Sequence, residues 1–167
     1  MTGKWTSILI GALTYVFLGT LMSAFGSAAG GFSAVLSCLV ILGSAAVAVW
    51  HYTSTNGLTI TGGEGAGMGA LTGLIGAVIA GILGYFLISI GAIPDPMDVA
   101  VQQMRDQGMT EEQIEQGMGM AEMFSSPFIG IAVGAVFGLI GGAIGGAIGA
   151  ALFKKGGPDP TPREAGL

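Results

Sequence analysis

Few side chains in this 167-residue chain could carry out chemistry, and the sequence scatters them. Cys38 is the single cysteine and His51 the single histidine, so neither an internal disulfide nor a Cys/His metal site is expected. A cysteine nucleophile needs a partner base, and none stands near Cys38 in the sequence. We interpret Cys38 as a buried, inert thiol, with a reactive thiol as the alternative. We interpret His51 as a polar anchor at a membrane edge, with a ligand or proton carrier as the alternative.

The acids concentrate in one segment, 92–126, which also holds six of the nine methionines. Acids and methionines together could bind copper(I) or another soft cation. However, Met118, Met120 and Met123 would spread around a helix instead of converging, so adaptable packing is the preferred interpretation. We expect no metal and no cofactor. The acids of this segment are Asp95, Asp98, Asp106, Glu111, Glu112, Glu115 and Glu122.

The overall composition places these residues in a membrane protein. Hydrophobic residues make up 51% of the chain and charged residues only 9%, against about 25% in an ordinary soluble domain. The mean hydropathy is +0.77. A net charge of −5 without a basic stripe argues against nucleic acid as a partner. The lipid bilayer is the partner that this composition predicts.

The hydropathy predicts an all-α membrane protein, with a single four-helix domain over 1–155 and a flexible tail over 156–167. A cleaved signal peptide is the alternative for the first apolar run. We expect Trp5, Trp50 and Tyr52 to form an aromatic belt at one membrane face. The predicted spans are 5–28, 32–52, 64–91 and 127–153.

Between the third and fourth spans, 92–126 is predicted to be a short insert of two amphipathic helices. Asp95 followed by Pro96 is typical of a helix start, and Thr110 to Gln113 reads as a capping box. A similar box, Thr61 to Glu64, opens the third span. Capping is therefore our preferred role for Glu64, over a functional acid.

Glycines recur every four residues in the third and fourth spans, which places them on one face of each helix. Such rows let helices approach backbone to backbone. We expect the two rows to face each other, as grooves that run almost from end to end. Second rows, among them Gly141, Gly145 and Gly149, are left for another helix, another copy, lipid or a different protein. The helix-packing residues are Gly65, Gly69, Gly73 and Gly81 in the third span and Gly130, Gly134, Gly138, Gly142 and Gly146 in the fourth.

Five bases predict the orientation. With four spans, Lys4, Lys154, Lys155 and Arg163 flank one membrane side, and Arg105 alone flanks the other. The positive-inside rule then places both termini in the cytoplasm and the acidic insert outside. The expected location is the inner (plasma) membrane.

The second half of the chain resembles the bacterial membrane-protein family catalogued as domain of unknown function 4199. The resemblance is carried by Tyr52, Asn56-Gly57, the 108–127 stretch GMTEEQIEQGMGMAEMFSSP and Lys154-Lys155. It covers 52–155, and the first two helices match in hydropathy only. The family implies four membrane helices with a long insert before the last. It carries no known activity, so no catalytic or binding residue follows from it.

Function is the least determined property. A structural or accessory subunit, as a homo-oligomer or within a larger membrane complex, is the first hypothesis. A small passive channel or transporter component, lined by small hydroxyls, is the alternative, although no charged residue lies deep in a predicted span. We expect no enzyme, because the nucleophiles have no partner base at membrane depth.

Overall fold

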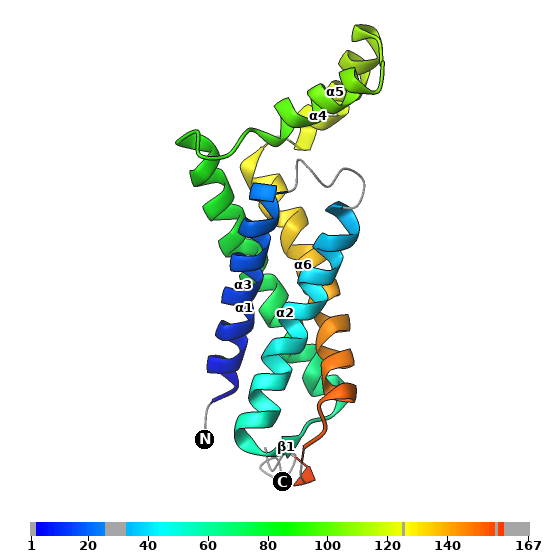
Figure 1. Ribbon diagram of the computed structural model, residues 1–167. Coiled ribbons are helices and arrows are strands. Elements are labelled where there is room, and N and C mark those ends of the chain that lie inside the picture. Colours follow the sequence, from blue (N-terminus) through cyan, green and yellow to red (C-terminus); the bar gives the residue numbers. More distant parts are fainter. Residues whose placement is uncertain (1–2, 26–32, 125, 156, 159–167) are drawn as a thin grey trace.

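The computed structural model describes residues 3–25, 33–124, 126–155 and 157–158 (Figure 1). Four long helices form a bundle, and two shorter helices form a hairpin beyond one end of it. Each of the four is long and apolar enough to cross a membrane. The long helices are α1 (Lys4–Phe25), α2 (Ser33–Asn56), α3 (Gly62–Ser89) and α6 (Pro127–Leu152), and the short ones are α4 (Pro96–Asp106) and α5 (Glu111–Phe124).

The bundle is built around the pair α2 and α3. Helix α1 packs against both of them, and α6 packs against both from another side. The start of α1, the end of α2, the start of α3 and the end of α6 lie together at the bottom of Figure 1. We call this the terminal end, and the opposite end, from which α4 and α5 project sideways, the hairpin end.

Helix α2 ends about one turn later than predicted, at Asn56 instead of residue 52. The polar residues that read as loop stay helical by bonding back to their own backbone. The Thr53 hydroxyl donates to the Val49 carbonyl at 3.0 Å, and the Asn56 amide donates to that of Tyr52 at 2.9 Å. The turn follows at Gly57, whose φ of 67° is one that glycine readily adopts.

The bundle places large and small side chains in the reverse of the arrangement found in a water-soluble protein. The buried positions of the bundle are mostly small, whereas the large apolar side chains point outward. On α1, Trp5, Leu9, Leu13, Phe17 and Leu21 recur every four residues and are all exposed. This pattern is typical of helices that meet each other through small residues and meet lipid through large ones. The small buried residues include Ser7, Ala12, Ser44, Ala45, Ala48, Thr72, Ala77 and Ala150.

The predicted aromatic belt is wrong for one of its three members. Trp5 and Trp50 are exposed, at 64% and 46%, but Tyr52 is only 5% exposed. Tyr52 lies in the apolar cluster of the terminal end with Ile8, Val49 and Met68. Its position next to Trp50 is why the sequence suggested a shared role. On a helix, however, residues two apart point in different directions.

Two short strands add a detail that an all-helical prediction lacks. Strand β1 (Leu58–Thr59), between α2 and α3, pairs in parallel with β2 (Gly157–Pro158), after α6. The start of the predicted flexible tail is therefore held against the α2–α3 connection. The rest of that tail, 159–167, lies outside the described residues, as do residues 26–28 of the first predicted span.

Candidate functional site

The closest helix contact joins the predicted glycine rows of α3 and α6. Gly65 lies against Gly146, Gly69 against Gly142, and Gly73 against Gly138. At each position an added Cβ atom would collide with the backbone of the other helix. This half of the contact, toward the terminal end, is therefore backbone against backbone.

The predicted rows do not remain in contact to the hairpin end. Gly81 faces the side chain of Ile131, and around Gly130 and Gly134 no described atom lies within 4 Å of an added Cβ. The reason is geometric, because four residues exceed one helical turn by about 40°. A row of five positions, which makes four such steps, winds away from a straight partner. A step of seven deviates by only about 20°, which is why Ile131 replaces the glycine row beyond Gly138.

The second glycine row of α6 is occupied within the same chain. Gly145 lies against the backbone of Leu42, Gly141 against Ile41, and Gly149 against Ala46 and Val49, all in α2. The residue numbers of the α2 partners rise with those of the α6 glycines, so α2 and α6 run parallel. Helix α6 thus uses one glycine row for α3 and the other for α2.

Glycines also fit α1 into the bundle. An added Cβ on Gly11 would stand 2.7 Å from the Cβ of Ala48 in α2 and 2.7 Å from the Cγ2 of Thr72 in α3. Gly76 of α3 lies against the ring of Tyr15. At Gly11 the three helices therefore meet with no room for an added methyl group, and at Gly76 the missing side chain makes room for the Tyr15 ring.

The terminal end holds a cluster of polar groups that joins three helices. Glu64 accepts hydrogen bonds from the Thr61 backbone N–H at 2.9 Å and from the Thr61 hydroxyl at 3.1 Å, and Thr61 caps α3 in return. The other Glu64 oxygen lies 3.7 Å from Nζ of Lys4. That ammonium lies 5.7 Å from the centre of the Tyr52 ring. The predicted capping role of Glu64 is confirmed, and an ion pair with α1 is added.

His51 has a partner that the sequence did not indicate. Its Nδ1 lies 3.0 Å from the hydroxyl of Ser7, one turn after Lys4 in α1. A serine beside an imidazole is also the arrangement of a nucleophile and its base. Ser7 is fully buried, however, so no substrate could reach its oxygen in this conformation. The pair joins α1 to α2 near the Lys4–Glu64 pair.

The interpretation of Cys38 as buried is wrong, because its thiol is exposed on the outer face of α2. Its neighbours Val35 and Leu39 are exposed as well. Because the large apolar side chains of this bundle point outward, a position within a span does not imply burial between helices.

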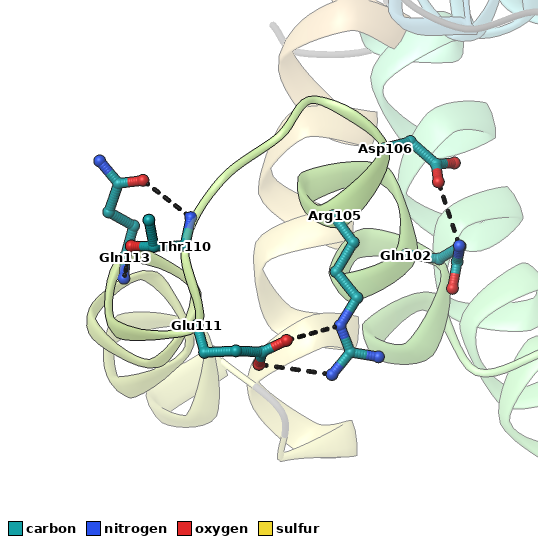
Figure 2. Close-up of polar contacts among 6 residues, drawn as sticks. All are labelled: Gln102, Arg105, Asp106, Thr110, Glu111 and Gln113. Atoms are coloured by element: carbon teal, nitrogen blue, oxygen red, sulfur yellow. Dashed lines mark hydrogen bonds and ion pairs between the residues drawn. The ribbon is translucent and has the colours of Figure 1, made fainter.

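The predicted insert is a helical hairpin with the expected caps (Figure 2). The Asp95 carboxylate accepts from the Met97 backbone N–H at 2.8 Å, with Pro96 in the first turn. Gln113 accepts from the Thr110 backbone N–H at 3.0 Å. Arg105 pairs with both oxygens of Glu111, at 3.1 and 3.4 Å, and so ties the end of α4 to the start of α5.

The start of α6 is confirmed at Pro127, but Ser126 makes no side-chain cap bond there. For metals, the described residues contain no group of three or more His, Cys, Asp or Glu side chains that could hold an ion.

Comparison with known proteins gives a family and no activity. A family model described as a protein of unknown function (DUF4199) matches residues 4–155. The match includes α1 and α2, for which the sequence resemblance was limited to hydropathy. No curated protein and no solved structure matches the chain. Because the family model covers most of its length, the chain belongs to the DUF4199 family.

Proposed function

We propose that this protein is a structural or accessory subunit of a bacterial inner membrane, without enzymatic activity of its own. It crosses the membrane four times and acts through its packing and its projecting hairpin. The observation that carries the proposal is the close approach of the helices through small residues. The two glycine rows of α6 fit against α3 and α2, which leaves a tightly packed bundle with a large apolar exterior.

The polar groups of the spans also support a packing role. A passive pore would need its hydroxyls for water or ions. Instead, the Thr72 hydroxyl donates to the Met68 carbonyl at 2.9 Å, and the Thr14 hydroxyl donates to that of Ile10 at 2.8 Å. The Ser44 hydroxyl likewise donates to the Ile41 carbonyl at 2.9 Å. The protons of these three hydroxyls are thus donated to carbonyls of their own helices and not to water.

In the proposed orientation both termini are cytoplasmic and the hairpin of α4 and α5 is extracytoplasmic. The distribution of bases supports it, because Lys4, Lys154 and Lys155 belong to the terminal end and Arg105 to the hairpin. A single cysteine at Glu112, in a Cys38→Ser background, should react with an impermeant maleimide added to intact spheroplasts. A cysteine at Thr59 should react only after lysis. The reverse pattern would refute the orientation.

Two measurements on the purified protein test the function. Gentle detergent extraction from the native membrane should retain a second copy or a stoichiometric membrane partner, identified by mass spectrometry. Liposomes holding the protein should show no flux of ions or small solutes above protein-free liposomes. Flux that disappears on heating the protein, with no retained partner, would favour the passive channel and contradict the accessory role.

A further inference from the structure

The bases at the terminal end differ in whether a carboxylate neutralises them. Lys4 is paired with Glu64 at 3.7 Å and lies over the Tyr52 ring. Lys154 and Lys155, directly after α6, are both exposed. Among the described residues, no acid lies within ion-pair distance of either of them. Among the described bases of the terminal end, Lys154 and Lys155 are therefore the two that no described acid neutralises.

The depth of these two lysines follows from the packing of α6 on α2. Ala150 lies in the buried cluster with Val49 and Tyr52, and Gly149 lies against Val49. Lys154 lies two residues beyond the end of α6 at Leu152, and Trp50 follows Val49 directly in α2. The exposed Trp50 ring and the lysine pair thus belong to the same end of two adjacent parallel helices. Exposed tryptophans mark the headgroup level of a bilayer.

We propose that Lys154 and Lys155 bind the headgroup of an anionic phospholipid beside the outer face of α2 and α6. This lipid site rests on the proposed membrane insertion of the four long helices. A lysine stem can lie along the apolar helix end while its ammonium reaches the phosphate level. The exposed apolar side chains of α6, such as Ile148 and Leu152, then lie where acyl chains would run.

The negative charge of the hairpin end restricts the proposed binding of anionic lipid to the terminal end. Its single base, Arg105, is paired with Glu111, and six further acids surround that pair in sequence. Anionic headgroups are repelled there and attracted at the terminal end. Attraction of about fivefold per unpaired lysine is the magnitude expected near an anionic surface.

The test is titration of phosphatidylglycerol and phosphatidylcholine into the detergent-solubilised full chain, followed by native mass spectrometry. The wild type should bind phosphatidylglycerol at least tenfold more tightly than phosphatidylcholine. Lys154→Gln with Lys155→Gln should abolish this preference, and the double change to Arg should retain it. Lys4→Gln with Glu64→Gln is the matched control, and it should retain the preference because it removes an ion pair without changing the net charge of the terminal end.

The proposal is overturned if the Lys154→Gln, Lys155→Gln variant still prefers phosphatidylglycerol, or if the Lys4→Gln, Glu64→Gln variant loses the preference equally. Loss in both the Gln and the Arg double variants of Lys154 and Lys155 would also overturn it, because it would indicate lysine-specific packing instead of charge. A wild-type chain that does not fractionate with membranes would contradict the proposed insertion itself. Membrane fractionation therefore separates failure of the proposed function from failure of this lipid site.

Discussion

The carbonyl oxygen of Gly73 lies 2.5 Å from the position that a Cβ atom would occupy on Gly138. The two backbones are thus in direct contact, which permits weak Cα–H···O=C interactions and close dispersion contacts between helices. Neither contact tolerates a methyl group, because the atom that it would strike is backbone and cannot rotate away. The α3–α6 contact is therefore the part of the molecule most sensitive to small substitutions.

Gly73→Ala should destabilise the bundle, because its methyl group would collide with the Gly138 carbonyl. Overpacking of this kind costs about 1–3 kcal/mol. Gly67→Ala in the same helix is the control, since Gly67 is exposed and its Cβ would meet no described atom within 4 Å. The control gains the same helix propensity without a collision, so its midpoint in an SDS titration should equal or exceed that of the wild type. Equal midpoints for the two variants would contradict the contact.

Gly145→Ala tests whether the second glycine row serves the monomer. Its methyl group would strike the Leu42 backbone of α2, so the free energy of unfolding should fall by about 1–3 kcal/mol. The oligomeric state, measured by light scattering in detergent, should not change. Gly43→Ala, next to Leu42 and without a described neighbour within 4 Å, is the control. A dissociated oligomer with unchanged monomer stability would instead place this row between copies.

Glu64→Ala should cost more stability than Lys4→Met. The first change removes the ion pair and the Glu64 half of the α3 capping box, whereas the second removes the ion pair and the cation–π contact. Loss of the hydrogen bond from the Thr61 backbone N–H to Glu64 costs about 0.5–1.5 kcal/mol. The ion pair contributes less, because both side chains are 34% exposed and solvent screens them. Thermal unfolding in detergent checks the order, and a larger effect for Lys4→Met would refute it.

The Ser7–His51 hydrogen bond should appear as a coupling energy. In a double-mutant cycle with Ser7→Ala and His51→Ala, we expect about 0.5–1.5 kcal/mol, the usual net contribution of one hydrogen bond. Each unfolding free energy comes from an SDS titration. Additive effects of the two changes would show that the hydroxyl and the imidazole do not interact.

Arg105→Gln should loosen the hairpin without affecting the bundle. Both Arg105 and Glu111 are mostly exposed, so the bundle should lose less than about 0.5 kcal/mol. Amide hydrogen exchange over 107–113 should become faster, because the variant no longer ties α4 to α5. Unchanged exchange there would mean that the caps alone hold the hairpin. Glu115→Gln is the matched control, because Glu115 forms no ion pair with another described residue.

The number of helices and their polar starts could be predicted from the sequence, because these depend on local patterns. The apolar runs, the Thr61–Glu64 box and the Asp95-Pro96 start are each read within a few residues. The meeting of Gly65, Gly69 and Gly73 with α6 also follows from local spacing. The loss of that contact beyond Gly138 does not, since it depends on how a row winds around a straight helix.

The remaining differences depend on which way a helix faces. Cys38 and Tyr52 both lie in α2, yet the first is exposed and the second buried. Glycine on several faces of α6 obscured which side meets α2. The Ser7–His51 pair was hidden for a related reason, because it requires the register between α1 and α2. That register is set by tertiary packing at Gly11, and no sequence motif encodes it.

The reversed distribution of large and small side chains has a thermodynamic consequence. In a bilayer, Phe17 or Phe137 would touch hydrocarbon whether the helices are associated or apart. Separating the helices therefore exposes little apolar surface to water, and the heat capacity should change little. Cooling would then not weaken this bundle as it weakens a water-soluble core. Replacing one large apolar residue by another on the outer face should therefore be tolerated. Adding a single methyl group between the helices should not be.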